Sequence, residues 1–236
     1  MTCIYDYYSD VGGRENNEDA ALALGDRGRY LFAVCDGLGG HECGEVASAM
    51  AVEELKRQFE DGNTPFDPVR AISDANLKIL KKQREDGKKM KTTVALAYIN
   101  GNVTTVAHVG DSRVYLFCGN RIVFQTVDHS ASQLAVASGE IQPSQIRHHE
   151  DRNILTRALG ANENMKSEKV EMPTNMIDAL LISSDGFWEY VYEEDMLTQL
   201  ERSEQPSKWL SGMREIHDRS VPPRHDNHTA VVAFVK

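Results

Sequence analysis

The sequence predicts an α+β protein built as a four-layer α-β-β-α sandwich with two central antiparallel sheets. Short β-rich runs separated mostly by tight turns fill much of the chain, whereas helical periodicity is confined to two blocks that flank a central group of strands. Two stacked sheets with helices outside would bury every apolar stripe. The 236 residues are 41% hydrophobic and 26% charged, and no repeat or linker divides them. We therefore expect one domain over residues 1–236.

The strands are expected where β-branched, aromatic and other apolar residues form short runs bounded by turn residues. Asn100-Gly101 and Gly119-Asn120 each separate two such runs, and these residue types tolerate positive φ, which predicts two short hairpins. The middle of the chain is therefore expected to be an antiparallel meander. The expected strands are 3–9, 20–24, 30–35, 93–99, 103–109, 113–118, 121–126, 168–172, 178–183 and 229–235.

Each helical block contains apolar stripes at helical spacing. The first block predicts a helix over about 43–60 and a second helix for which Asp67-Pro68 supplies the N-cap and the first residue. The second block predicts a short helix followed by another over about 206–219. The stripe residues, expected to face the core, are Val52, Leu55 and Phe59; Val69, Ile72, Ile79 and Leu80; Met196, Leu197 and Leu200; and Trp209, Met213 and Ile216.

One segment, 128–152, fits neither a strand nor a regular helix, because it contains Gly139 and Pro143. We expect a surface excursion with a short helix over Ala131 to Ser138. Irregular segments of this length in compact domains are commonly functional covers, which favours a flap beside a site. A harmless insertion is the alternative.

The charge balance limits the partners. With 26 Lys+Arg against 36 Asp+Glu, the net charge is −10, which disfavours nucleic acid and anionic membranes as partners. The four cysteines form no CxxC pair, and no run approaches the ~18 apolar residues of a membrane span. We expect a cytoplasmic, monomeric protein.

The most informative pattern is an aspartate beside a residue that frees the backbone, placed at the end of a buried strand. It occurs three times, and in a fourth instance the aspartate precedes its strand, so in an antiparallel neighbour its carboxylate would emerge at the same sheet edge. A single Asp-Gly pair is usually a turn, but the repeated pattern favours one shared cleft. The pairs are Asp36-Gly37, Gly110-Asp111, Asp185-Gly186 and Asp226-Asn227.

Clustered carboxylates repel one another and bind protons unless a cation compensates them, so the pattern predicts a metal site. Oxygen ligands without a Cys or His set favour hard ions such as Mg(II) or Mn(II) over zinc. Gly37 and Gly186 lack a Cβ, which lets the main chain turn sharply and approach an ion.

The segment 13–19 places one cation before a polar, acidic run. It is either a charged hairpin turn or part of the site. In the second interpretation Arg14 forms bidentate hydrogen bonds to a phosphate, while Glu18 and Asp19 orient metal-bound waters.

Together these motifs resemble, in order and over almost the whole chain, those of the metal-dependent PPM, or type 2C, protein phosphatases in their short bacterial form. Two further landmarks of that family flank the expected flap, at 128–130 and 155–160. The motifs are Arg14-Glu15-Asn16-Asn17-Glu18-Asp19, Val34-Cys35-Asp36-Gly37-Leu38-Gly39-Gly40-His41, His108-Val109-Gly110-Asp111-Ser112-Arg113, Ser184-Asp185-Gly186 and Asp226-Asn227.

The resemblance implies two central antiparallel sheets flanked by helices and a binuclear Mn(II) or Mg(II) centre at one end. It implies that Asp36 bridges the two ions and that Gly37 offers its backbone carbonyl to one of them. Asp185 and Asp226 would hold the other ion. Asp111, with Asp185, would support a weaker third ion.

The resemblance also assigns the remaining site residues. Glu18 and Asp19 would contact metal-bound water, and Arg14 would hold the substrate phosphate. Two ions lower the pKa of a shared water and neutralise the phosphate oxygens during in-line attack. His41 is the nearest candidate for a general acid that protonates the leaving group, since its ordinary pKa is close to the working pH. It is alternatively a structural residue at the start of the 43–60 helix.

Two positions depart from the family pattern, with Lys91 where a glycine is common and His228 where an aliphatic residue is usual. Neither removes a ligand. We expect a Mn(II)- or Mg(II)-dependent phosphatase of phosphoserine and phosphothreonine proteins, opposing a bacterial Ser/Thr kinase. The alternatives are a catalytically silent pseudophosphatase that binds phosphoproteins and a metal phosphoesterase of small phosphate esters.

Overall fold

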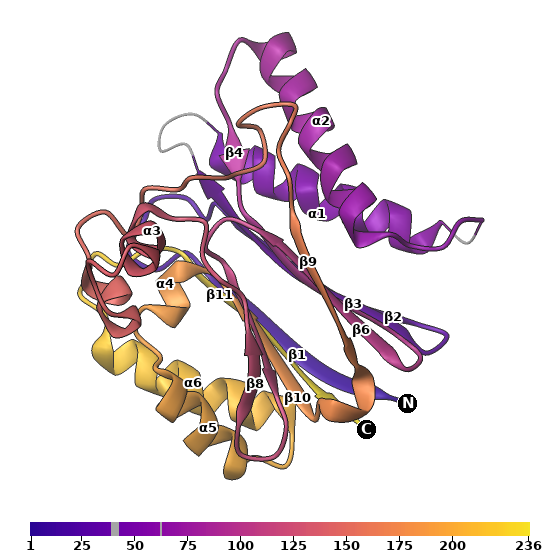
Figure 1. Ribbon diagram of the computed structural model, residues 1–236, viewed down its shortest axis with the longest axis vertical. Coiled ribbons are helices and arrows are strands. Elements are labelled where there is room, and N and C mark those ends of the chain that lie inside the picture. The colour runs from indigo at the N-terminus through magenta and orange to yellow at the C-terminus, as the bar shows by residue number, and fades with distance from the viewer. Residues whose placement is uncertain (39–42, 62) are drawn as a thin grey trace.

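The computed structural model of the protein describes residues 1–38, 43–61 and 63–236. Two antiparallel sheets lie face to face, and helices cover the outer face of each (Figure 1). The predicted four-layer sandwich is therefore confirmed.

The first sheet has five strands in the order β1-β11-β10-β7-β8. It joins the two ends of the chain, because β1 runs antiparallel to β11. Its strands are β1 (Cys3–Asp10), β7 (Arg113–Phe117), β8 (Ile122–Gln125), β10 (Ala179–Ser183) and β11 (His228–Val235).

The second sheet runs in the order β2-β3-β5-β6-β9, with the short β4 paired to β3. The two expected hairpin turns are present, since Gly101 and Gly119 adopt φ of 56° and 54°. The strands of this sheet are β2 (Asp19–Asp26), β3 (Arg29–Leu38), β4 (Lys91–Thr92), β5 (Val94–Asn100), β6 (Val103–Val109) and β9 (Glu168–Pro173).

The helices α1 (Gly44–Glu60) and α2 (Pro68–Asp86) cover the second sheet, and α5 (Glu193–Glu201) and α6 (Pro206–Ser220) cover the first. Asp67 caps α2 as predicted, accepting the amide of Val69 at 3.0 Å. Sequence reasoning did not predict α4 (Asp185–Trp188) or the 3-10 helices η1 (Pro143–His148) and η2 (Thr174–Met176). In the part of the chain that is described, no helix combines the length and hydrophobicity of a membrane span.

The core has three layers because the inner strands bury both faces. In β3, Phe32 and Val34 pack between the two sheets, while Leu31 and Ala33 pack under α1 and α2. Successive strand residues point to opposite faces, so a continuous apolar run marks a strand covered on both sides.

Two expectations need correction. Val69 is 37% exposed rather than part of the core stripe of α2, because the buried face of the first turn is formed by Pro68, Ala71 and Ile72. The short helix predicted in the flap is present as α3 (Ala131–Ala137), but the base of the flap is not at the surface as expected, because Asp128 is buried in an ion pair with Arg113 at 2.7 Å. That buried pair fixes the base of the flap to β7.

Helix α1 is joined to α2 by a carboxylate that is almost fully buried. The Glu54 side chain is 1% exposed, accepts hydrogen bonds from Arg57 at 2.6 and 2.9 Å and from Gln58 at 2.7 Å, and pairs with Lys78 on α2. These partners, led by Arg57, lower the pKa of Glu54 from 4.5 to about 2.

We expect Glu54→Gln to reduce the free energy of unfolding at pH 7 by about 1–2 kcal/mol, since its cationic partners are half exposed. A lowered pKa stabilises the fold above the unfolded value of 4.5 and loses that effect as the pH falls towards 2. Urea unfolding at several pH values between 7 and 3.5 should therefore show the wild-type advantage shrinking below pH 4.5. Glu60→Gln, on the exposed side of α1, is the control. A difference in unfolding free energy between the wild type and Glu54→Gln that does not change with pH would contradict the lowered pKa of Glu54.

Candidate active site

Four aspartates from both sheets meet at one end of the sandwich. Asp19 begins β2 directly opposite Asp36 near the end of β3. Asp185 follows β10 and Asp226 precedes β11, and these strands are antiparallel neighbours, as the sequence pattern predicted. Ser184 donates a hydrogen bond to the Asp19 carboxylate at 2.7 Å, which ties the two sheets together at this point.

The carboxylates are held close enough to disturb one another's ionisation. Withdrawal from solvent, followed by the charge of neighbouring aspartates, raises the pKa of Asp36 well above its ordinary value. Withdrawal from solvent is also the main cause that raises the pKa of Asp185 to about 7 and of Asp19 to about 6. The pKa of Asp111, a buried residue, is raised for the same reason and by Asp185.

Such a cluster fits divalent cations. Buried carboxylates whose pKa values are raised by loss of solvent and by mutual repulsion are stabilised by positive charge, and oxygen donors suit hard ions such as Mg(II) and Mn(II). One cationic side chain already lies there: Arg14 donates to Asp226 at 2.7 Å, with 58% of its side chain exposed.

The two glycines of the Asp-Gly pairs are required by close packing of chain segments. A Cβ on Gly37 would lie 2.3 Å from the carbonyl oxygen of Gly44, at the start of α1. A Cβ on Gly186 would lie 2.1 Å from the carbonyl oxygen of Asn227. The segments that present the aspartates therefore lie directly against their neighbours.

The backbone of Asp36 is fixed by β4 and the residue after it. The amide of Thr93 and the hydroxyl of Thr92 both donate to the Asp36 carbonyl at 2.8 Å, and the Asp36 amide donates to the Thr93 hydroxyl at 2.9 Å. Sequence reasoning assigned these threonines no role. Their place directly before β5, the strand paired with β3, was the available signal.

Asn227 joins the two ends of the chain at the site. Its side-chain nitrogen, Nδ2, donates to the backbone carbonyls of Val11 and Asn16 at 2.8 and 2.9 Å. Its side-chain oxygen, Oδ1, accepts a hydrogen bond from the backbone amide of Glu18 at 2.8 Å. The loop that contains Arg14 is thereby held against the start of β11. The pKa of Glu18 is raised, chiefly by burial and then by nearby acidic charges.

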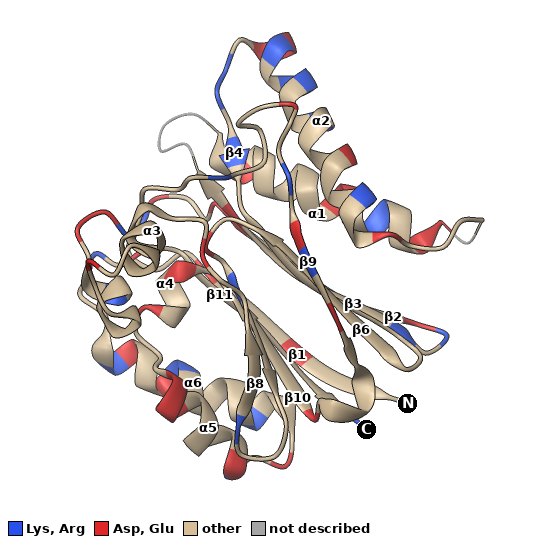
Figure 2. Ribbon diagram, in the orientation of Figure 1, with Lys and Arg blue, Asp and Glu red and all other residues tan. Residues whose placement is uncertain are grey.

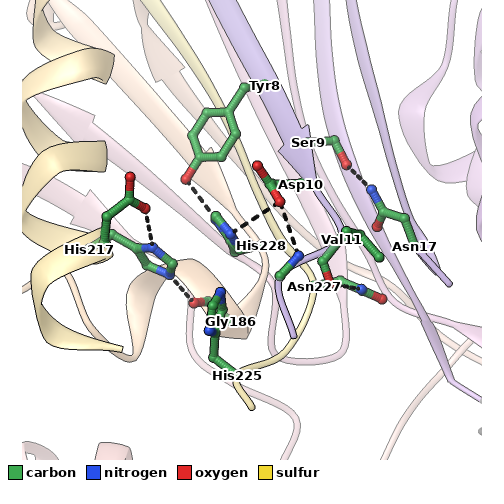
Figure 3. Close-up of polar contacts among 12 residues, drawn as sticks. Tyr8, Ser9, Asp10, Val11, Asn17, Gly186, His217, His225, Asn227 and His228 are labelled. Atoms are coloured by element: carbon green, nitrogen blue, oxygen red, sulfur yellow. Dashed lines mark hydrogen bonds and ion pairs between the residues drawn. The ribbon is translucent and has the colours of Figure 1, made fainter. Parts of the chain in front are cut away.

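A histidine cluster, His217, His225 and His228, lies beside Gly186 (Figure 3). The Gly186 carbonyl can only accept, so Nε2 of His217 has a proton and donates to that carbonyl at 2.9 Å, while Nδ1 lies 3.3 Å from the Asp218 carboxylate. The ring of His228 stacks on His217 with centroids 4.0 Å apart, and its Nδ1 is 3.0 Å from the Tyr8 hydroxyl. Burial lowers the pKa of His228 to about 4. His228 thus packs between Tyr8 on β1 and His217 on α6.

His108, His129 and Glu168 form a group whose potential ligand atoms lie within 4.8 Å of one another. The hydrogen bonds explain this group without an ion. The Gly110 amide donates to Nδ1 of His129 at 3.1 Å, so Nε2 has the proton and faces Glu168, also at 3.1 Å. Arg157 adds a cation 3.0 Å from the same carboxylate. Both nitrogens of His129 are therefore engaged.

This group instead fixes the peptide before Asp111. The amide of His129 donates to the Gly110 carbonyl at 2.9 Å, so His129 satisfies both polar groups of Gly110. The indole of Trp188 donates to the Asp111 carbonyl at 3.0 Å from the other side. Asp111 thus lies between the base of the flap and α4. His41 lies outside the described residues.

Comparison with known proteins agrees with this architecture. The model of the family described as protein phosphatase 2C matches residues 9–224. The chain belongs to the protein phosphatase 2C family. The serine/threonine phosphatase stp of Listeria welshimeri is 31% identical over 193 residues, which cover 78% of this chain and 77% of that protein. Protein phosphatase PhpP of Streptococcus pneumoniae is 31% identical over 189 residues, covering 75% of this chain and 76% of its own length.

Solved structures of family members superpose over the whole chain. Serine/threonine phosphatase Stp1 from Staphylococcus aureus has a TM-score of 0.89 at 29% identity, covering 100% of this chain and 96% of that one. The Mycobacterium tuberculosis serine/threonine phosphatase PstP/Ppp has a TM-score of 0.86 at 28% identity, covering 100% of both chains. This phosphatase 2C member is thus a protein serine/threonine phosphatase.

Proposed function

We propose that this phosphatase hydrolyses phosphoserine and phosphothreonine in proteins at a binuclear Mn(II) or Mg(II) centre. The observation behind this proposal is the convergence of four aspartates from both sheets, three of which (Asp19, Asp36 and Asp185) have raised pKa values, with Arg14 beside them. Asp36 would bridge two ions, the Gly37 carbonyl would bind one, and Asp185 and Asp226 would bind the other. Asp111 would support a weaker third ion.

The bound ions would supply an activated water and neutralise charge on the phosphate oxygens. The chain's own residues would orient the reactants. Arg14 would leave Asp226 and donate two hydrogen bonds to the substrate phosphate, which its exposed guanidinium can reach. Glu18 and Asp19 would accept hydrogen bonds from water at the centre. His41 would donate a proton to the seryl or threonyl oxygen.

The deciding experiment measures phosphate release from a phosphothreonine peptide by purified protein, with Mn(II), with Mg(II) and with EDTA. Turnover that requires the metal supports the proposal. Folded protein that binds Mn(II) without hydrolysing peptide or p-nitrophenyl phosphate would indicate a phosphoprotein-binding pseudophosphatase. Hydrolysis of p-nitrophenyl phosphate alone would indicate an esterase of small phosphates.

We expect Arg14→Ala to raise KM for the phosphopeptide about tenfold, because a charge-assisted bidentate contact to phosphate is lost. The Mn(II) concentration needed for half-maximal activity should change little. Steady-state kinetics at saturating Mn(II) checks this, with Arg27→Ala, at a site 90% exposed, as the control. An unchanged KM would remove Arg14 from the phosphate site.

We expect His41→Ala to retain Mn(II) binding and to slow phosphothreonine peptide about 10- to 100-fold, while slowing p-nitrophenyl phosphate much less. A poor alkoxide leaving group needs a proton in the transition state, and an aryl oxide does not. Comparing kcat of the variant for both substrates separates the role of general acid from that of a structural residue. Equal slowing would leave His41 as a structural residue.

We further propose that residues 1–236 act as one catalytic domain with 128–152 as its flap. In this proposal the protein is a cytoplasmic monomer that opposes a Ser/Thr kinase and binds neither nucleic acid nor membrane. The buried pair Arg113–Asp128 at the flap base supports coupling of the flap to the catalytic sheet. Size-exclusion chromatography with light scattering tests the monomer.

A further inference from the structure

Four exposed lysines on two neighbouring segments have no acidic partner within ion-pair distance among the described residues. We call them the lysine rim: Lys88, Lys89, Lys91 and Lys166. Among the described residues, the acids at the end of α2 and in the segment 163–168 are already paired with other cations. These pairs are Lys81–Glu85 at 3.7 Å, Lys82–Asp86 at 3.0 Å, Arg84–Glu163 at 3.2 Å and Arg157–Glu168 at 3.0 Å.

The two segments that contain the lysine rim are joined by hydrogen bonds. Thr92 and Leu159 exchange backbone bonds at 3.2 and 2.8 Å. The side-chain amide nitrogen of Gln83, Nε2, donates to the backbone carbonyls of Met90 and Gly160 at 2.5 and 2.9 Å. In Figure 2, where Lys and Arg are blue, blue segments lie on the connection from α2 to β4 and on β4 itself. The two segments that contain these lysines therefore lie side by side.

The lysine rim borders the candidate metal centre. In the pairing of β4 with β3, Thr92 lies opposite Gly37 and Lys91 lies opposite Leu38. Paired Cα atoms in antiparallel strands are about 4.5–5.5 Å apart. Lys91 is therefore next to Leu38, which follows Asp36 by two residues on β3. An extended peptide advances about 3.3 Å per residue. Residues a few positions from a bound phosphoresidue can therefore reach the rim.

We propose that the lysine rim binds acidic side chains that flank the phosphoserine or phosphothreonine of the substrate. This proposal rests on the proposed function. The net charge of −10 would by itself favour basic substrates, but the rim reverses the sign of the charge beside the site. A hollow of about 410 Å³ next to it is lined by Arg157, Asn162 and Lys166, which offer donors to a carboxylate, and by Glu168. The substrate class is thus an acidic phosphopeptide.

The test compares kcat/KM for three phosphothreonine peptides that differ only in their flanks, which contain aspartate, serine or lysine at the two to four positions on each side. The wild type should prefer the acidic peptide to the neutral one. The triple variant Lys89→Gln/Lys91→Gln/Lys166→Gln should reduce that ratio about tenfold, as several weak surface ion pairs are lost together. Raising the salt to about 0.5 M should weaken the wild-type preference in the same direction.

A matched variant, Lys56→Gln/Lys169→Gln/Lys208→Gln, removes the same charge elsewhere and should retain the wild-type ratio. If the wild type hydrolyses all three peptides equally, or if both triple variants lose the preference to the same extent, the rim does not select the substrate. Hydrolysis of no peptide, with Mn(II) bound, would instead overturn the proposed function. The failures of the two proposals are therefore distinguishable.

Discussion

Asp36→Asn should reduce turnover of a phosphothreonine peptide by at least about 10³-fold, because a neutral amide in the bridging position would remove several kcal/mol of transition-state stabilisation. The same change should stabilise the metal-free protein. It removes one member of a cluster whose charges raise one another's pKa, so the melting temperature without metal should rise by roughly 2–6 °C. Kinetics and thermal melts of one preparation, with Mn(II) and with EDTA, measure both effects.

The control for this prediction is Asp6→Asn on β1, outside the cluster, which should change neither quantity. Mn(II) should raise the melting temperature of the wild type more than that of the variant, since only binding to the folded state stabilises it. Retention of a tenth or more of the activity would show that Asp36 is not a bridging ligand. A lower melting temperature without metal would show that the cluster is not repulsive.

Gly186→Ala should lower the melting temperature by about 3–10 °C and weaken Mn(II) binding at least tenfold. The added Cβ would lie 2.1 Å from the Asn227 carbonyl oxygen, so the segments that contain Asp185 and Asp226 must separate. Overpacking of this kind costs about 1–3 kcal/mol, and each kcal/mol shifts the melting temperature by roughly 2–4 °C in a chain of this size.

Calorimetry of Mn(II) binding and thermal melts test this prediction. Gly212→Ala in α6 is the matched control, because the added Cβ there meets only the flexible side chain of Gln199. Unchanged metal affinity in Gly186→Ala would mean that the segments containing Asp185 and Asp226 can accommodate an added Cβ. Their contact would then not determine the distance between Asp185 and Asp226.

The layers and the meeting of the aspartates could be predicted because both follow from local patterns. The apolar run at Phe32 to Cys35 has no polar face, which indicates a strand covered on both sides. Asp226 precedes its strand where Asp185 follows one, and antiparallel pairing alone brings such positions to one edge. Each of these inferences needs only residue type and strand direction.

The bonds that hold the site could not be predicted, since they join backbone groups that are distant in sequence. His129 binds the peptide of Gly110, and Asn227 binds carbonyls of the N-terminal loop. A carbonyl belongs to every residue, so residue type gives no signal for such partners. The buried Arg113–Asp128 pair shows why the flap was misjudged: charged residues indicate exposure unless the partner that neutralises them is known.

The position of β11 has a consequence for synthesis of the protein. This strand follows every other described element in the chain, yet it lies between β1 and β10 and is preceded by Asp226 and Asn227. A nascent chain that has not yet released these residues from the ribosome has an unpaired edge on β1 and lacks the Asn227 hydrogen bonds to the loop that contains Arg14. The site therefore cannot assemble before β11 has left the ribosome. The cell gains phosphatase activity only from molecules in which β11 has been inserted between β1 and β10.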